Sequence, residues 1–507
     1  MFSTSPREVA LVLTLCFAQL LTQAGLGQSV APLHYIGDSF GVTTPGLLSW
    51  YPAGFSLTVG TFILPAGRLG DVFGPKRLLL IGWAWYSLWS LLAGLAIYTT
   101  NSFFIIARVF QGIGPALLLP NAVAVLGRIY KRGRRREIVF SLFGATAPSG
   151  FLVAAVFASI LTDRVSWSWA YYLMAITCAL LVVATWAFVP DDDEPAQAQD
   201  PGEDGGRVSI NESSDPIWQR IDGTGALLAV LGLVLVNVPI NQAPISGWSD
   251  PWVGTLLGVG VLFLVAFVLY EMHWAKHPLA PLASLTRNSI YVLGCLALGW
   301  SSFGIWIYYL WQILERLRRQ PILLVAAQVA PASVSGFLAA ICSGLLMGRI
   351  GPSPVMLIAM LAFMTGNILV ATMPVDQTYW AQAFVSFIVA PWGMDLSFPS
   401  ASIVLSYSVP RHHQGAVASM VSTVINYSIS IGLGLAGTIE VHQNRGGTDD
   451  LKGFRAALYL AIGLAGAGAT IASVFFASSM IQGREKRRNR AAVAFRLQQK
   501  SSFVESP

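Results

Sequence analysis

The sequence predicts an all-α polytopic membrane protein with fourteen transmembrane helices. Three observations lead to this fold class: 54% of the 507 residues are hydrophobic, only 11% are charged, and long apolar runs recur along the whole chain. Soluble domains carry about 25% charged residues, whereas a bilayer core of about 30 Å is crossed by about 20 apolar helical residues. Lipid is therefore the expected solvent for most of the chain, and a cytosolic enzyme is excluded.

The apolar runs give the expected helices in chain order. Their approximate bounds are 9–29, 46–66, 77–98, 102–126, 138–161, 169–189, 223–243, 251–271, 289–313, 321–345, 353–373, 378–407, 415–438 and 455–481. The first run is longer than the apolar core of a signal peptide and leads directly into further spans, so we expect it to be retained. An even number of crossings places both chain ends on one side of the membrane.

The distribution of Lys and Arg indicates which side that is. Basic residues gather at 131–136, after the fourth run, and at 484–490, after the last. Because cytosolic loops are enriched in Lys and Arg, we predict that both termini are cytosolic. The multi-pass protein is expected at the plasma membrane. The cluster Arg316, Arg318 and Arg319 falls on the outer side in this topology. It marks the place where a span could be miscounted.

The chain is expected to consist of two six-helix bundles and an inserted helix pair. The predicted parts are an N-terminal bundle (1–189), an acidic cytosolic linker (190–222), the inserted pair (223–271), a loop (272–288), a C-terminal bundle (289–481) and a basic cytosolic tail (482–507). The polar, acidic composition of the linker is typical of disorder. Its glycosylation sequon at Asn211 should stay unmodified in the cytosol.

Two similar loops support a repeat of the kind that transporters often contain. One reads Gly-Arg-Leu-Gly-Asp-Val-Phe-Gly-Pro-Lys-Arg at 67–77, and the other reads Gly-Arg-Ile-Gly-Pro at 348–352. They occupy equivalent places if spans one to six and nine to fourteen form the two bundles. The repeat therefore predicts that spans seven and eight are the insertion.

The 67–77 loop is predicted to act as a conformational latch. Its glycines let helix ends approach closely, and its acid can form charge pairs in one state that break in another. The alternative is a tight turn that carries cytosolic positive charges. The latch residues are Gly67, Arg68, Gly70, Asp71, Gly74, Lys76 and Arg77.

Two ionisable residues inside the predicted spans, Arg108 and Asp395, are the candidates for proton coupling. A charge at the bilayer centre costs about 2.5–3.5 kcal/mol or more and usually faces a cavity or a partner. Each has a structural alternative: Arg108 could bond to neighbouring carbonyls, and Asp395 could stabilise the kink that its flanking prolines cause.

Polar and aromatic residues elsewhere in the spans are candidates for lining a substrate cavity. Such residues can also form hydrogen bonds between helices or an aromatic belt at the lipid interface, so both readings stay open. The cavity candidates are Gln19, Gln23, Trp306, Tyr309 and Asn426.

These motifs resemble those of the major facilitator superfamily, specifically its fourteen-spanner drug:proton antiporter branch. The 67–77 loop is similar to the signature between helices two and three, and the stretch 393–399 resembles the fungal aminotriazole-resistance and low-affinity ammonium transporter subgroup. The residues similar to the helix-four motif are Arg108, Gln111, Gly112 and Gly114, and those similar to the antiporter motif of exporters are Gly144, Pro148 and Gly150.

The resemblance implies a proton-coupling role for Arg108. The chain departs from the branch in span one, where Gln23 stands at the place of a membrane-embedded aspartate that many members carry. An amide cannot titrate, which puts proton exchange through span one in doubt. Any coupling would then depend on Arg108, on Asp395 or on acids near the mouths of the protein.

The sequence thus predicts a secondary active efflux transporter of drugs, toxins or secondary metabolites, coupled to proton antiport. The alternatives are an uptake carrier or facilitator for a small cation such as ammonium, and a membrane scaffold or sensor that moves nothing. Expected partners are a small-molecule substrate, protons and the bilayer but no nucleic acid, and one chain with two bundles can act as a monomer. A Walker lysine loop, a zinc-spaced His pair and a nucleophile elbow are all missing from the sequence, so no enzymatic activity, cofactor or metal is expected.

Overall fold

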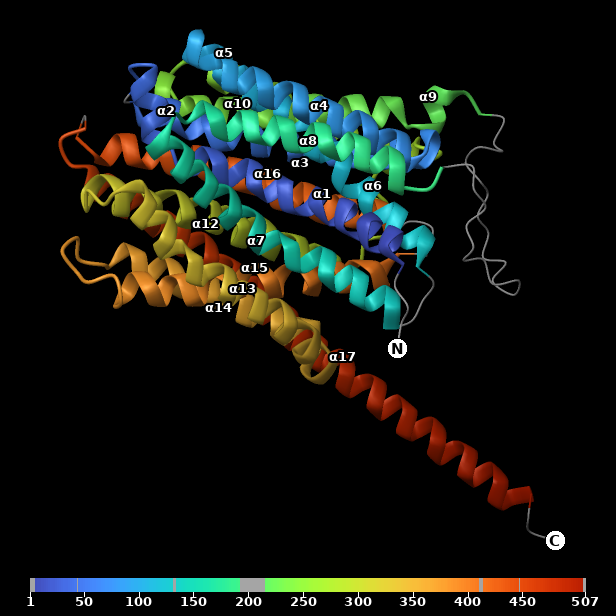
Figure 1. The fold of residues 1–507 in the computed structure, drawn as a ribbon. Coiled ribbons are helices and arrows are strands. Elements are labelled where there is room, and N and C mark those ends of the chain that lie inside the picture. Colours follow the sequence, from blue (N-terminus) through green and yellow to red (C-terminus); the bar gives the residue numbers. More distant parts are fainter. Residues whose placement is uncertain are drawn as a thin grey trace.

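All regular elements in the described part of the chain are helices (Figure 1). The structure is a computed structural model that describes residues 5–42, 44–130, 134–191, 215–409, 414–445 and 447–504. Within these ranges fourteen helices are long and apolar enough to cross a membrane, which confirms the predicted fold class. Most of the linker, including Asn211, lies outside the described residues, as do Lys131 and Arg132 of the first basic cluster.

The N-terminal half contains eight α-helices and one short 3₁₀ turn. They are α1 (Pro6–Val30), α2 (Leu33–Ser39), α3 (Pro45–Phe73), α4 (Pro75–Leu95), η1 (Ala96–Tyr98), α5 (Asn101–Gln111), α6 (Ile113–Ile129), α7 (Arg134–Arg164) and α8 (Ser168–Phe188). The main contacts within this half join α1 to α7, α4 to α8, and α6 to both α4 and α3.

A short helix and a long helix pair follow the linker. They are α9 (Ile217–Arg220), α10 (Gly223–Ser246) and α11 (Pro251–His273). Besides its partner α11, helix α10 packs against α3 of the N-terminal half and α16 of the C-terminal half. The pair therefore contacts both halves of the molecule.

The C-terminal half is built from six long helices with one π-helical turn. Its elements, with the 3₁₀ turn that precedes them, are η3 (Leu282–Ser284), α12 (Arg287–Gln312), η4 (Ile313–Leu317), α13 (Ile322–Ile350), α14 (Pro352–Ala371), α15 (Gln382–Ser408), α16 (Gln414–Gln443) and α17 (Asp450–Val504). Helix α17 extends well beyond its neighbours, and both chain ends lie at the same end of the helix array (Figure 1).

The two similar loops form turns of the same geometry. Gly74 has φ +94° and Gly351 has φ +83°, conformations that favour glycine. Each glycine is followed by a proline at the first position of the next helix, Pro75 of α4 and Pro352 of α14. Proline is well suited to that position because its fixed φ matches the helix and its missing N–H is not needed there.

The fourth predicted span is one crossing made of two helices. Helix α5 ends at Gln111, α6 begins at Ile113, and Gly112 lies between them. A Cβ atom added to Gly112 would lie only 2.4 Å from the Phe55 carbonyl oxygen of α3. The break therefore occurs where span four approaches α3 too closely for any side chain.

Candidate functional site

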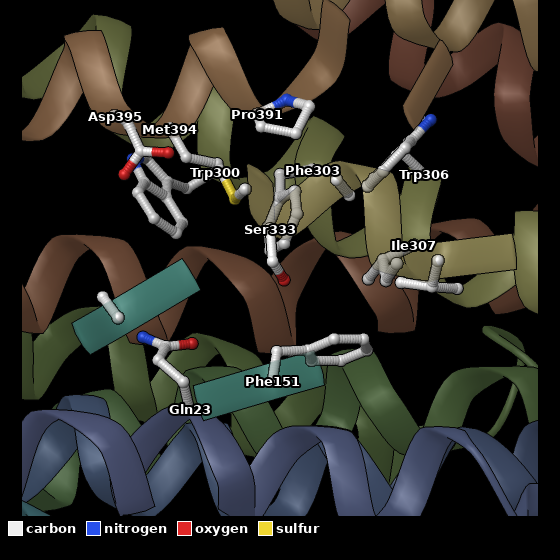
Figure 2. Close-up of a pocket in the computed structure, with 13 residues that line it drawn as sticks. Gln23, Phe151, Trp300, Phe303, Trp306, Ile307, Ser333, Pro391, Met394 and Asp395 are labelled. Carbon is white, nitrogen blue, oxygen red and sulfur yellow. The ribbon is translucent and has the colours of Figure 1, made fainter. Parts of the chain in front are cut away.

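A cavity of about 60 Å³ lies between the two halves of the molecule (Figure 2). Helices α1 and α7 form one wall, and α12, α13 and α15 form the other. The residues that line it are Gln23, Ala147, Phe151, Trp300, Phe303, Trp306, Ile307, Val329, Ala332, Ser333, Pro391, Met394 and Asp395. Pockets for drug-sized ligands measure about 300–1,000 Å³, so this cavity holds a few waters or a small ion.

The wall from the C-terminal half is largely aromatic, and its polar atoms are bonded away from the cavity. Trp306 Nε1 donates to Ser386 Oγ at 2.7 Å, and Trp300 Nε1 donates to Ser397 Oγ at 3.2 Å. The Trp300 and Phe303 rings meet edge to face with centroids 5.5 Å apart. These contacts fix the rings, so the cavity presents rigid apolar faces.

Asp395 supplies the one carboxyl group among the residues that line this cavity. It lies in α15 between Pro391 and Pro399, both inside the helix. Its Oδ2 atom is buried and has no hydrogen-bond partner among the described residues. An unpaired buried carboxylate is costly in an apolar environment, so the group can accept a proton or a donor from a bound molecule.

The opposite wall brings Gln23 and Phe151 to the cavity. Gln23 points toward it from α1, and Phe151 from α7 (Figure 2). The Phe151 ring also meets the Trp311 ring of α12 edge to face, with centroids 6.4 Å apart. Gln23, Trp306 and Asp395 were expected from the sequence, whereas Phe151 and Phe303 were not assigned to the site.

Arg108 is completely buried inside the N-terminal half and does not line the cavity. Its guanidinium donates to the Tyr51 carbonyl at 3.1 Å, to the Gly25 carbonyl at 2.7 Å and to Ser29 Oγ at 3.1 Å, and also to Gln111 Oε1. Its carbon Cζ lies 4.6 Å from the centroid of the Phe55 ring. These bonds match the structural alternative for this residue.

The remaining helix-four residues serve packing and support. Gln111 Nε2 donates to Ser90 Oγ of α4 at 2.7 Å, so the amide bridges Arg108 and α4. A Cβ atom on Gly114 would lie 2.5 Å from Tyr86 Cβ of α4. Both residues thus fix α5 and α6 against α4 and hold the buried guanidinium.

The latch residues contact several separate parts of the chain. Arg68 Nε donates to the Arg220 carbonyl of α9 at 2.8 Å. Lys76 Nζ donates to Asp191 Oδ1 at 2.8 Å, and this bond together with the lysine charge lowers the pKa of the Asp191 carboxyl. Asp71 is among the acids that face Arg68. Arg77, the last of the latch residues, also interacts with a neighbouring group.

The latch glycines mark close helix contacts. A Cβ atom on Gly67 would lie 2.7 Å from Ser419 Oγ of α16, and one on Gly70 would lie 1.7 Å from Asn121 Oδ1 of α6. Gly67 therefore joins the N-terminal half to the C-terminal half, whereas Gly70 joins two helices of the N-terminal half.

Three cavity candidates do not line the cavity. Tyr309 donates to Glu440 Oε2 of α16 at 2.8 Å, and Asn426 donates to the Ser422 carbonyl of its own helix at 2.9 Å. Gln19 lies one turn before Gln23 on α1 and is likewise missing from the lining. The buried pair of Tyr309 with Glu440 was not foreseen, since Glu440 is distant in sequence and its burial depends on tertiary packing.

The antiporter-like motif in α7 is divided between different surroundings. A Cβ atom on Gly150 would lie 2.2 Å from the Leu20 carbonyl oxygen of α1, so this glycine is a packing contact. A Cβ atom on Gly144 would meet no atom within 4 Å. Pro148 lies within the helix, and its side chain is outside the described part of the structure.

Helix α2 lies at the end of the molecule opposite to the chain termini (Figure 1), and a second group of charged residues surrounds it. His34 of α2 is near Arg316, Asp38 and Asp450, and its imidazole faces Gln312 of α12. Burial, and then the charge of Arg316, lower the pKa of His34 to about 4. Arg316 in turn pairs with Asp450 at 3.1 Å. No group of three or more His, Cys, Asp and Glu in the described residues could hold a metal ion.

Fourteen candidate spans and a cavity shared by two halves define a polytopic membrane protein of the transporter class. The family model for the Major Facilitator Superfamily matches residues 13–433 and 295–505. The chain therefore belongs to the Major Facilitator Superfamily, whose members are transporters and not enzymes.

Curated relatives and solved structures agree with this assignment. The chain is 51% identical to the low affinity ammonium transporter of Saccharomyces cerevisiae (98% of this chain, 92% of the relative). It is 43% identical to the efflux pump terJ of Aspergillus terreus (96% and 91%) and 36% identical to the aminotriazole resistance protein of S. cerevisiae (96% and 87%). A crystal structure of a POT family transporter with a thioalcohol conjugated peptide shares the fold, with a TM-score of 0.67 at 15% identity over 94% and 97% of the two chains.

Proposed function

We propose that this protein is a secondary active exporter of small organic molecules that works by proton antiport and alternating access. The observation that carries the proposal is the Asp395 carboxyl, which faces a cavity between the two halves and has one unpaired buried oxygen. A proton can satisfy that oxygen, and so can a donor group of a substrate. The proton and the donor group of the substrate cannot bind this oxygen at the same time. Such competition would allow the carrier to exchange a proton for a substrate molecule.

The size of the cavity supports a moving carrier. At about 60 Å³ it is too small for a drug-sized molecule, so such a substrate requires the halves to separate. In the proposal, 1–189 and 289–481 are the two bundles that rock about this cavity. The latch at Gly67, where α3 contacts α16, would close the end of the molecule where the chain termini lie.

We assign Arg108 a positioning role in proton coupling. Its guanidinium donates to the Gly25 carbonyl, two residues after Gln23, which lines the cavity. The arginine thereby fixes the part of α1 that faces Asp395. In this proposal the proton binds at Asp395, and Arg108 holds the opposite wall in place.

The basic clusters support an orientation with both termini cytosolic, in a protein that we propose resides in the plasma membrane. The chain ends lie at the same end of the helix array (Figure 1), and Lys and Arg gather near them in the sequence. Export then runs from the side of the chain termini to the opposite side. We expect the single chain, with its two bundles, to act as a monomer.

Names of the relatives support export of organic molecules. The efflux pump terJ and the aminotriazole resistance protein each cover more than nine tenths of this chain. The second candidate function is the uptake of a small cation such as ammonium, favoured by the 51% identity to the low affinity ammonium transporter. A small cavity with one carboxyl group and several aromatic faces also suits a small cation.

The test is the flux of protons in proteoliposomes that contain the full chain, with aminotriazole and methylammonium as probes. Antiport predicts that aminotriazole on one side drives protons the opposite way. Asp395→Asn is expected to reduce this proton flux at least tenfold, because an amide cannot take up the proton. Asp376→Asn, which changes an exposed acid between α14 and α15, is the matched control and should leave the flux unchanged.

The outcomes separate the candidate functions. Co-directional or uncoupled flux of methylammonium, with no response to aminotriazole, favours the cation carrier. If neither probe moves across the membrane or drives protons, the transport proposal fails for both substrate classes. Proton exchange that survives Asp395→Asn rejects the proposed site.

A further inference from the structure

The inserted helix pair contacts one helix of each half. Helix α10 packs against α3 of the N-terminal half and against α16 of the C-terminal half, and α3 also packs directly against α16. Helix α11 packs against α10. If the two halves rock as proposed above, α3 and α16 change their relative positions. Helix α10 can then keep only one of its two contacts unchanged.

The contact of α10 with α16 contains buried hydrogen bonds. Ser430 Oγ donates to Asn237 Oδ1 at 2.9 Å, and Asn241 Nδ2 donates to Ser430 Oγ at 3.3 Å. Tyr427 Oη donates to the Leu233 carbonyl at 2.8 Å. Asn237, Asn241 and Ser430 are each 0% exposed. Separation of α10 from α16 would therefore leave several buried polar groups without a partner, which is costly.

Two glycines of α16 also bring this helix close to α10. A Cβ atom on Gly434 would lie 2.8 Å from the Ile240 carbonyl oxygen, and one on Gly437 would lie 3.2 Å from Pro244 Cγ. Small residues that allow close backbone approach, combined with hydrogen bonds between helices, are typical of stable helix contacts in membranes. Helix α10 is therefore joined to α16 by both kinds of contact.

The contact of α10 with α3 is apolar. A Cβ atom on Gly46 of α3 would lie 2.8 Å from Ile245 Cγ1 and 3.1 Å from Pro244 Cβ. In the described part of the chain, each hydrogen bond that α10 forms with either half ends on α16. The bond from Arg68 Nε of α3 ends on the Arg220 carbonyl of α9, before the pair begins. Helices α3 and α10 can thus separate without leaving a buried polar group of α10 unpaired.

We infer that the inserted helix pair moves as one body with the C-terminal half, while its contact with α3 opens and closes during the transport cycle. Gly46 lies at the start of α3, which follows α2 at the end of the molecule opposite to the chain termini (Figure 1). The contact of α3 with α10 therefore opens on that side. The inference rests on the alternating access proposed above, but it does not depend on the direction of transport, on the coupling ion or on Asp395.

The test joins one position of α10 by a disulfide to either α16 or α3. Pro244→Cys with Gly437→Cys forms the α10–α16 bridge, and Pro244→Cys with Gly46→Cys forms the α10–α3 bridge. The Cβ atoms would lie 3.6 Å apart in the first pair and 3.1 Å apart in the second. Disulfides have Cβ atoms about 3.5–4.5 Å apart, so the first pair fits and the second needs a small shift.

Both variants are built in the same background of the full chain. Ile245→Ala removes the Cγ1 atom that would crowd a side chain at position 46, and Cys342→Ser removes the one native cysteine that is not buried. Bridge formation is verified by the mass of the intact protein after alkylation of free thiols in denaturant. The background without either bridge is the parent for all comparisons.

The first measurement is the flux of aminotriazole or methylammonium, whichever the parent transports, in proteoliposomes. The α10–α3 bridge should reduce this flux by about tenfold or more, because it prevents the conformational step. A reducing agent should restore the flux, which shows that the variant is folded. The α10–α16 bridge should leave the flux within about twofold of the parent, because it joins parts that move together.

The second measurement needs no transported substrate. Ala147→Cys adds a thiol to the α7 wall of the cavity, and a membrane-impermeant maleimide is supplied on the side opposite to the chain termini. Labelling should be several-fold slower with the α10–α3 bridge than with the α10–α16 bridge, because the cavity cannot then open toward the reagent. If the parent transports neither probe, the proposed function fails, but this comparison still decides the inference.

Three patterns of results would overturn the inference. The α10–α16 bridge could block flux and labelling as strongly as the α10–α3 bridge, or both bridges could leave them unchanged. A reversed pattern would assign the inserted pair to the N-terminal half. If the variant with Gly46→Cys does not fold, the α10–α16 bridge alone still decides, since loss of flux or of labelling upon its oxidation contradicts the inference and unchanged values support it.

Discussion

Arg108 and Asp395 are both ionisable residues inside membrane spans, but their surroundings differ. Every hydrogen bond of the Arg108 side chain described above ends on a neighbour in the N-terminal half. Asp395 faces a cavity between the halves with one buried oxygen unpaired. A saturated charge has no reason to change its protonation in a cycle, whereas an unpaired carboxyl can exchange partners. Burial alone therefore does not separate the two residues, and the unpaired oxygen of Asp395 is the reason why we propose it as the proton site.

The largest effect is expected from Arg108→Leu. The substitution removes the charged donor from the Gly25 and Tyr51 carbonyls, which keep their helical hydrogen bonds, and leaves Gln111 Oε1 without its donor. Hydrogen bonds to a charged group are worth about 1.5–3 kcal/mol each. We expect a strong loss of thermal stability in detergent, measured as Tm, together with poor yield. Arg108→Lys, which keeps the charge but fewer donors, should lose less. An unchanged Tm with an altered pH profile of transport would reverse the comparison and assign Arg108 a direct part in coupling.

A smaller effect is expected when a second acid is placed opposite the first. Gln23→Asp would put a carboxyl on the α1 wall of the cavity that holds Asp395. Because two nearby carboxylates repel each other, the dependence of exchange on pH should change. The measurement is the pH profile of exchange in proteoliposomes. Gln19→Asp, one turn earlier and outside the cavity, should leave the profile in place.

The aromatic wall should influence substrate affinity more weakly. Trp306→Phe removes the bond to Ser386 and reduces the apolar surface that faces the cavity. Aromatic contacts are worth about 0.5–1.5 kcal/mol, so the substrate concentration for half-maximal flux should change by about two- to tenfold. Trp380→Phe alters a Trp that is 70% exposed and serves as the control. A tenfold loss of maximal flux at unchanged affinity would instead assign Trp306 to the conformational step.

The smallest effect concerns His34, at the opposite end of the molecule from the latch. Its pKa falls from 6.5 to about 4 on folding, so the unfolded chain binds more protons between these values. Stability is therefore lost as pH falls from 6.5 toward 4 and is unaffected above that window. His34→Gln should reduce the drop in Tm across this range by a few degrees, and His442→Gln, at an exposed position, should not. An equal drop in both variants would show that other groups govern acid stability.

Much of the fold follows from the sequence because the bilayer imposes a simple length requirement. Each span needs a long apolar run, and the runs give the same number of crossings as the structure. Gly74 and Gly351 could be placed in turns, because their neighbouring prolines and the repeated loop sequence mark them. The bend at Gly112 could not be placed, since it depends on the approach of α3 to span four.

The site was only partly predictable, because part of its lining also depends on how the helices pack against each other. Asp395 and Gln23 were found because polar groups are rare in apolar runs. Phe151 and Phe303 resemble many other aromatic residues in the spans, and only the packing of α7 and α12 turns them to the cavity. The contact of Arg68 with α9 joins residues on either side of the linker, and no local pattern announces it.

The small volume of the cavity limits the amount of water that the protein can hold beside Asp395. The cavity has room for only a few water molecules beside Asp395. In the proposed proton antiport, so little interior water would offer ions no wide path past this carboxyl group. A small cavity and a low leakage of ions would thus go together in the proposed antiporter.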